Sequence, residues 1–272
     1  MRILSLVLTF FMLFGVTGCK DYKPDSITVL SREEGSGTRS AFEKLVNIDE
    51  TSPYAEISDS TAVMITSVQG NKNAIGYISL GALSERVKCL KIDGYTPFAE
   101  NLKNGSYKLS RQFSIITKNE ISEITKDFIS FILSRNGQKI VENNKYISVS
   151  DSGDYKPLNP TGKIKISGSS SVTPVMEKLK EAYIALNPDT VIEIQQSDSS
   201  NAIQSTSDGI CDIGMISREL TENEKQKGLI SSAIATDSIA VIVNKENRLD
   251  NISIEQLADI YTQKLTLWSE IK

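Results

Sequence analysis

Short apolar runs alternate with segments of helical periodicity from residue 27 onward. Apolar runs are typical of buried strands, and apolar residues at helical spacing are typical of helices that bury one face. In the first half, strands are predicted at 27–30, 74–80, 87–92 and 113–117, and helices at 38–46, 61–70, 120–133 and 137–143. This alternation favours an α/β architecture.

The polar segment 148–162 divides the chain and has the composition of a linker. After it the alternation begins again. Strands are predicted at 163–167, 191–195, 210–216 and 239–244, helices at 171–186 and 200–207, and capping boxes at Thr221 and Ser253. We therefore predict an α/β chain of mostly parallel sheets with helices on both faces.

The N-terminus has the pattern of an exported protein. Residues 1–18 place an apolar stretch behind Arg2, too short to span a membrane and typical of a signal peptide. The stretch ends Val-Thr-Gly-Cys, which resembles the bacterial lipobox, although a buried strand or helix that ends in cysteine is an alternative. We expect a palmitate-type lipid on Cys19, a tether at 19–23, and a position on the extracytoplasmic face of the cell membrane.

Composition narrows the choice of function. A chain of 272 residues can form one large domain or two medium ones, and its net charge of −4 gives no reason to expect a nucleic-acid partner. The chain has no histidine, which excludes Ser-His-Asp and Cys-His catalysis. Cys89 and Cys211 could pair, but small buried residues are the favoured interpretation, and we expect neither a metal nor a cofactor.

Residues 31–39, Ser-Arg-Glu-Glu-Gly-Ser-Gly-Thr-Arg, connect a predicted strand to a predicted helix. The free backbone N–H groups and the dipole of a helix N-terminus favour an oxyanion at such a connection. Glycines allow close approach, the hydroxyls of Ser36 and Thr38 can donate, and Arg32 can bind two oxygens at once. The segment therefore predicts an oxyanion site.

Further segments repeat this logic at the carboxyl ends of predicted strands, where ligands bind in open α/β sheets. Each also has a simpler interpretation as a capped helix, a turn or a surface residue. The set contains a carboxylate, which can accept a proton from phosphate but repels fully ionised sulfate, so it favours phosphate. The segments are the loops 167–174 and 196–201, the pair Ser217–Arg218, and Asp237.

Several stretches resemble the PstS family, the phosphate-binding lipoproteins of bacterial phosphate ABC importers. They are residues 30–39, 73–81, 164–174, 211–220 and 235–244. The resemblance implies a two-lobed, type II periplasmic-binding-protein-like fold, each lobe a mostly parallel sheet flanked by helices, with phosphate in the cleft between the lobes. It assigns 24–108 with 245–272 to one lobe and 109–244, including the linker, to the other.

The resemblance also implies a set of phosphate-binding residues, with Asp237 as acceptor of the ligand proton. In the loop at Ser169–Ser171 the register can shift by one residue, and around Ser199 this chain has less glycine than relatives often have. The implied residues are Arg32, Ser36, Gly37, Thr38, Ser170, Ser171, Ser199, Ser217, Arg218 and Asp237.

The order of the motifs departs from the family. In ordinary members the loop matching 167–174 comes first, whereas here the loop matching 31–39 precedes it, as though the gene had been circularly permuted. The segment 148–162 then joins the family's usual termini. The new termini fall in the loop between residues 268–271 and 27–29.

We therefore expect a non-enzymatic, monomeric binding protein that captures inorganic phosphate and delivers it to the permease subunits of an ABC importer. One alternative is a receptor or sensor for another oxyanion. An extracellular phosphatase is another alternative, but it needs a nucleophile or a metal site that the sequence does not supply. A third is a permuted scaffold whose cleft no longer closes.

Overall fold

The computed structural model describes residues 25–271. The predicted signal peptide at 1–18, the lipidation site at Cys19 and the tether at 19–23 lie outside the described residues. Within residues 25–271, none of the helices combines the length and the apolar composition needed to cross a membrane.

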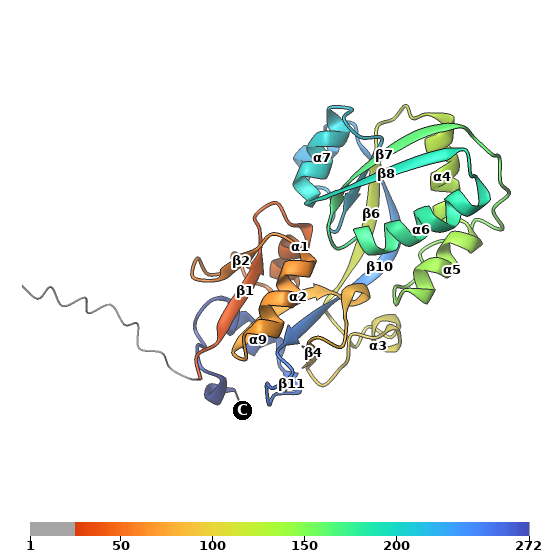
Figure 1. The fold of residues 1–272 in the computed structure, drawn as a ribbon. Helices are drawn as coiled ribbons and strands as arrows, with labels where there is room; N and C mark the ends of the chain where they lie inside the picture. Colours follow the sequence, from red (N-terminus) through yellow and green to blue (C-terminus); the bar gives the residue numbers. More distant parts are fainter. Residues whose placement is uncertain (1–24, 272) are drawn as a thin grey trace, which may run out of the picture.

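A nine-stranded mixed sheet runs through the molecule in the order β2-β1-β3-β10-β6-β9-β7-β8, and β4 pairs with β10 (Figure 1). At one end β1 is parallel to β2 and β3, and at the other end β7 is parallel to β8 and β9. The two middle strands, β10 and β6, are antiparallel to each other and to their neighbours. The strands are β1 (Thr28–Arg32), β2 (Glu56–Ser58), β3 (Ala74–Ser79), β4 (Lys88–Cys89), β6 (Ser110–Thr117), β7 (Gly162–Ser169), β8 (Thr190–Ser197), β9 (Ile213–Ile216) and β10 (Ile230–Val243). A separate pair consists of β5 (Lys91–Ile92) and β11 (Asn251–Ile252).

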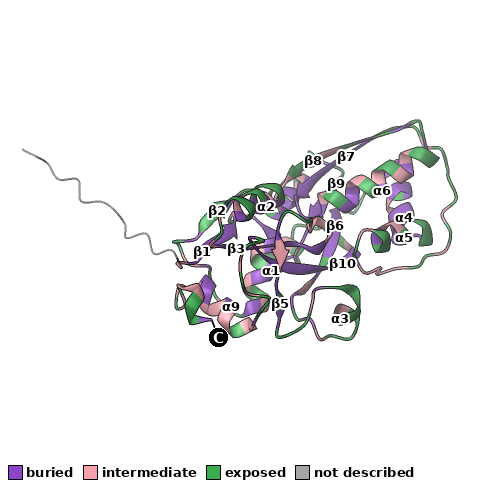
Figure 2. Ribbon diagram, turned by 60° about the horizontal axis from the view of Figure 1, so that its bottom comes forward, coloured by how far each residue is buried: buried purple, intermediate pink, exposed green. Residues whose placement is uncertain are grey.

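Helices pack around both ends of this sheet and bury its inner strands, whereas the edge strands β2 and β8 are largely exposed (Figure 2). One end carries α1 (Gly37–Val46), α2 (Thr61–Gly70), α3 (Ala99–Lys103) and α9 (Ile254–Tyr261). The other carries α4 (Glu123–Leu133), α5 (Arg135–Asn143), α6 (Thr173–Leu186), α7 (Ser199–Ser207) and the short α8 (Glu222–Lys225). Both predicted capping boxes are present, at Thr221 and Ser253. The α/β class is confirmed, with one mixed sheet in place of mostly parallel ones.

The buried apolar side chains separate into two lobes, and β6 and β10 cross from one lobe to the other. On β6, Leu109 just before the strand packs in the first lobe and Phe113 packs in the second. On β10, Ala235 belongs to the second lobe and Ile239 to the first. Residues 239–243 therefore pack in the first lobe, against β3, and not in the second lobe as predicted. We call β6 and β10 the crossover strands.

The segment 148–162 is bound to the second lobe along its length, unlike a free linker. The backbone N–H of Arg135 donates to the carbonyl of Gly153 at 2.8 Å, and Thr190 donates to the carbonyl of Pro160 at 2.8 Å. Between them, the Tyr155 hydroxyl donates to the buried carboxylate of Asp127 at 2.5 Å. The connection between the two halves of the chain is thus an ordered strap.

Candidate functional site

The loop after β1 is held by the aromatic core of the first lobe. The Tyr77 hydroxyl lies 2.8 Å from the Ser31 hydroxyl and accepts from the backbone N–H of Arg32 at 3.2 Å. The Tyr77 ring stacks on Phe42 of α1 with centroids 4.1 Å apart. Burial raises the pKa of Tyr77 to about 12, so its hydroxyl stays protonated at neutral pH. These contacts fix the direction in which the chain leaves the strand.

Arg32 extends from this loop to the opposite lobe. Its side chain is almost fully buried, and its Nη2 donates to the Ser170 hydroxyl, in the loop after β7, at 3.0 Å. Its Nε and Nη2 also donate to the two carboxylate oxygens of Glu33, at 2.7 and 2.6 Å. Glu33 therefore balances part of the positive charge of Arg32, while Nη2 also reaches the second lobe through Ser170.

Hydroxyl groups at the starts of α1 and α2 meet the same loop of the second lobe. The Thr38 and Ser171 hydroxyl oxygens lie 2.7 Å apart. Thr61, the first residue of α2, places its hydroxyl 3.3 Å from that of Ser170 and 3.4 Å from that of Ser171. Two helix N-termini of the first lobe thus contribute donors at one place.

The second lobe adds hydroxyls from two further connections. The Ser169 hydroxyl donates to that of Ser217 at 3.0 Å, and the backbone N–H of Ser217 donates to the Ser199 hydroxyl at 3.1 Å. The backbone of Gly37 packs directly on them, because a Cβ at this position would lie 2.7 Å from the Ser217 oxygen and closer still to that of Ser199. All these hydroxyl-bearing residues are buried, and we call them the hydroxyl cluster: Thr38, Thr61, Ser169, Ser170, Ser171, Ser199 and Ser217.

Asp237 lies on β10 beside the hydroxyl cluster, paired in register with Arg111 on β6. Arg111 donates from Nε and Nη2 to Asp237 Oδ2 at 3.2 and 3.1 Å, and from Nη1 to the Ser217 carbonyl at 3.4 Å. The Ser79 hydroxyl donates to Asp237 Oδ1 at 2.8 Å. Burial raises the pKa of Asp237 to about 6, although Arg111 and Ser79 act in the opposite direction.

Arg218 does not join the hydroxyl cluster. Its guanidinium makes a two-pronged ion pair with Glu224 at 2.7 and 2.8 Å, next to the capping box of α8. The hydrogen bonds from Arg218 lower the pKa of Glu224 to about 2. In this structure a local carboxylate binds the guanidinium of Arg218, and its contact with the ligand stays a prediction.

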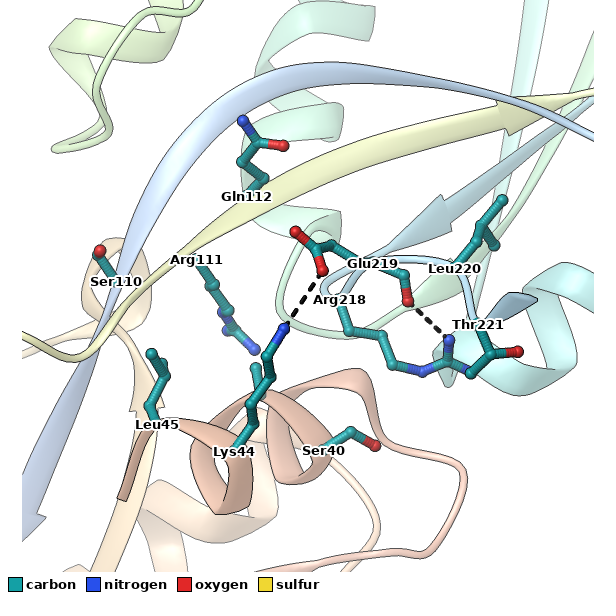
Figure 3. Close-up of a pocket in the computed structure, with 11 residues that line it drawn as sticks. Ser40, Lys44, Leu45, Ser110, Arg111, Gln112, Arg218, Glu219, Leu220 and Thr221 are labelled. Carbon is teal, nitrogen blue, oxygen red and sulfur yellow. Dashed lines mark hydrogen bonds and ion pairs between the residues drawn. The ribbon is translucent and has the colours of Figure 1, made fainter. Parts of the chain in front are cut away.

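A pocket of about 340 Å³ lies between α1 and residues 218–221, next to the crossover strands. Figure 3 shows Arg111 extending from β6 toward α1, and the ion pair of Lys44 with Glu219 across the pocket. That pair joins the two lobes at 3.3 Å with both side chains exposed. Arg111 is thus buried between the pocket that it lines and the Ser217 carbonyl to which it donates.

Most of the predicted site residues come together in the structure. Ser36 lies at the edge, where its hydroxyl caps α1 by accepting from the backbone N–H of Arg39 at 3.4 Å. Within residues 25–271, no group of three or more Cys, Asp or Glu is placed to hold a metal ion. The prediction did not include Thr61 or Arg111, and it reached Ser169 only through the one-residue shift of register in that loop. Thr61 could have been found from its place at the start of a predicted helix.

Known proteins resemble this chain over almost its whole length. A model described as PBP superfamily domain matches residues 23–136 and 156–271. The phosphate-binding protein PstS 2 of Streptococcus agalactiae is 49% identical over 271 residues, which cover 94% of this chain and 92% of its own. The crystal structure of a phosphate ABC transporter, phosphate-binding protein from Streptococcus pneumoniae TIGR4 has a TM-score of 0.72 at 43% identity, covering 91% of this chain and 100% of that one.

A second group of relatives matches only one part of the chain. The phosphate-binding protein PstS of Bacillus subtilis is 34% identical over 137 residues, 49% of this chain and 44% of its own. The matches over nearly the full length decide the assignment. The chain belongs to the PstS family of phosphate-binding proteins, within the PBP superfamily.

Proposed function

We propose that this chain captures inorganic phosphate between its two lobes, with Arg32 and the hydroxyl cluster as the binding groups. The observation that supports the proposal is that hydrogen-bond donors from both lobes meet at one place. Hydroxyls from both lobes lie within hydrogen-bond distance of one another and of a buried guanidinium, at the N-termini of helices. Neutral donors, helix dipoles and one arginine are the groups that bind a phosphate oxyanion in proteins.

The hydroxyls have a further property that suits phosphate. Each hydroxyl can donate to an ionised oxygen and can also accept from a protonated one, so the cluster can serve both forms of the ligand. Ser36, Gly37 and Thr38 add the backbone N–H groups of the first turn of α1. In our proposal Asp237 does not contact the phosphate directly, because its two carboxylate oxygens already accept from Arg111 and Ser79.

The same proposal covers delivery and location. We infer a monomeric, non-enzymatic binding protein that is anchored through a lipid on Cys19 at the extracytoplasmic face and hands phosphate to the permease subunits of an ABC importer. The lipobox-like residues 16–19 support the anchor. The names of the streptococcal relatives, a phosphate-binding protein and a phosphate ABC transporter component, support the ligand and the partner.

We also propose that the chain is a circular permutation of the ordinary family order. The Streptococcus agalactiae relative aligns through both halves, whereas the Bacillus subtilis protein aligns with about half of the chain, as a linear comparison of permuted sequences would give. The strap at 148–162 joins the two halves at the surface of one lobe. Such a join is compatible with the fold because it replaces surface termini.

Isothermal titration calorimetry of the full-length chain in detergent tests the ligand. We expect a saturable heat with phosphate, and competition with sulfate separates a phosphate receptor from a receptor for another oxyanion. Arg32→Met should lose most of the affinity, whereas Lys118→Met, on the far side of the second lobe, should not. No binding of phosphate by the wild type would refute the proposal, and turnover of a generic phosphate ester would favour the phosphatase alternative.

A further inference from the structure

Arg111 and Asp237 form a buried ion pair at the point where the chain crosses between the lobes. They face each other in register on β6 and β10, and their side chains are 3% and 0% exposed. Arg111 also lies 5.0 Å above the ring of Phe113, the first residue of the second core on that strand. The pair therefore lies between the two apolar cores, beside the hydroxyl cluster.

The contribution of a buried ion pair to the free energy of folding is too small to explain why Arg111 and Asp237 are charged. Removing two charges from water costs about as much as their attraction returns, and apolar replacements of similar volume are often as stable. Asp237 is the only acidic partner of Arg111 among the described residues, so the pair is not part of a larger ion network. A function for the guanidinium accounts for the charge better than packing does.

The direction of the Arg111 guanidinium connects it to the anion site. Its hydrogen bonds to Asp237 and to the Ser217 carbonyl use three of the five N–H groups of a guanidinium. Ser217 is a member of the hydroxyl cluster, so the positive charge lies directly behind that cluster. Arg218, the neighbour of Ser217 in the chain, is held by Glu224 instead.

A second guanidinium, that of Arg32, also contacts the hydroxyl cluster. Burial lowers the pKa of Arg111, Asp237 raises it, and the positive charge of Arg32 lowers it again. Arg32 donates to Ser170 and Arg111 donates to the Ser217 carbonyl, so the cluster contacts two guanidinium groups that repel each other. An anion bound there relieves this repulsion.

We propose that Arg111 is the second cationic residue of the anion site, in the role expected of Arg218, and that Asp237 is the positioning residue that holds it. The inference rests on the proposed function. Asp237 fixes the guanidinium through two bonds to one oxygen, and Ser79 fixes the carboxylate in turn. In this arrangement Asp237 acts on the ligand through Arg111 and does not receive a ligand proton.

A double-mutant cycle on the full-length chain separates these roles. The variants are Arg111→Met, Asp237→Asn and the combination of both, with phosphate affinity measured by titration calorimetry and folding by circular dichroism. The combined variant removes both charges and so leaves no uncompensated charge in the fold. We expect it to fold and to bind phosphate at least about tenfold more weakly than the wild type, the typical effect of a lost charged contact.

The cycle also predicts how the two residues depend on each other. In the Arg111→Met background, Asp237→Asn should change phosphate affinity by less than about threefold, since a positioning residue without its target has nothing to position. Arg111→Lys, which keeps the charge but loses the two-bond geometry, should bind more weakly than the wild type and more tightly than the combined variant. This graded result is not expected of a purely structural pair.

Each failure has a distinct meaning. A wild-type chain that binds no phosphate overturns the proposed function and this inference together. Wild-type binding with unchanged affinity in the combined variant, or in Arg111→Lys if the combined variant does not fold, overturns the role of Arg111 alone. An additive loss from Asp237→Asn in both backgrounds overturns the positioning role and restores direct contact between Asp237 and the ligand.

Discussion

Gly37→Ala is a one-atom test of whether binding depends on close contact between the lobes. The Cβ of an alanine there would lie 2.7 Å from the Ser217 oxygen and closer still to the Ser199 oxygen, whereas ordinary contact begins at 3.4 Å. Because the Ser199 oxygen is the nearer of the two, the two lobes must part by about 1 Å, or both hydroxyls must rotate out of their bonds. The helix itself gains, because alanine is a better helix former than glycine.

The distances across the cleft give the expected magnitude. A movement of about 1 Å along the same direction takes both the Thr38–Ser171 contact, from 2.7 Å, and the Arg32–Ser170 contact, from 3.0 Å, beyond the limit of a hydrogen bond. Loss of one charged hydrogen bond costs about 1.5–3 kcal/mol. Phosphate affinity should therefore fall by about tenfold to a hundredfold, while the free energy of unfolding changes by less than about 1 kcal/mol.

Titration calorimetry with phosphate and urea unfolding of the same preparations provide the two readouts. Gly70→Ala is the matched control, because Gly70 ends α2 and no atom lies within 4 Å of a Cβ built there. The control should leave phosphate affinity unchanged and change the free energy of unfolding by less than about 1 kcal/mol. If Gly37→Ala binds phosphate within threefold of the wild type, the lobes do not need to approach as closely as this structure has them, and the reasoning fails.

Three other predictions follow from the contacts described above. Asp127→Asn should lower the free energy of unfolding by about 1–3 kcal/mol and speed proteolysis of the strap, because the buried carboxylate accepts from Tyr155 and Tyr183 at 2.5 and 2.7 Å; unchanged urea midpoints and cleavage rates would contradict it. Asp237→Asn should alter the pH dependence of stability, because the pKa of Asp237 is about 6 in the folded protein and the ordinary value is 3.8. The stability that this group gives the wild type is therefore fully present below about pH 3.8. It is lost as the pH rises through 6, at about 1.4 kcal/mol per pH unit. Urea unfolding across this range should show the variant gaining relative to the wild type as pH rises, and parallel curves would count against it. Lys44→Ala removes only an exposed ion pair with Glu219, so unfolding free energy should change by less than about 1 kcal/mol and phosphate affinity by less than about threefold; a larger loss would mean that this pair controls closure.

The oxyanion loops could be predicted from the sequence because their signals are local. Residues 31–39 and 167–174 each place small hydroxyl-bearing residues between an apolar run and a helical pattern, and the structure has α1 and α6 beginning at or just after them. The helix starts at Ser60 and Ser253 follow from side-chain caps in the same way. What these signals leave open is which loops from distant parts of the chain meet.

The two arginines illustrate that limit. The family resemblance assigns Arg218 to the ligand, but Glu224 lies close enough in the chain to bind its guanidinium in this structure. Arg111 pairs with Asp237 across 126 positions, and only the register of β6 with β10 brings the two together. Sequence position alone does not give the direction of a long side chain.

The crossover strands were predicted too short for a related reason. Residues 230–238 are mostly small or polar and do not form strands by their own preference, yet they pair with β6 along nearly its whole length. Their composition reflects their position, since this part of the chain lies between two apolar cores and beside a polar site. The position of residues 230–238 beside the polar site therefore explains both their weak strand preference and their role near the ligand.

That position also explains how a small anion can govern the relation of the lobes. Each lobe has its own apolar core, and the contacts across the cleft consist mainly of hydroxyl pairs, the Arg32–Ser170 bond and one exposed ion pair. Each such contact contributes about 0.5–1.5 kcal/mol, so the closed arrangement is favoured only modestly by the protein alone. An anion that accepts from donors of both lobes binds the closed arrangement better than an open one, and it shifts the population by that difference in affinity. Because each lobe keeps its own apolar core and the cleft between them is polar, a small anion is enough to change the balance between the open and closed arrangements.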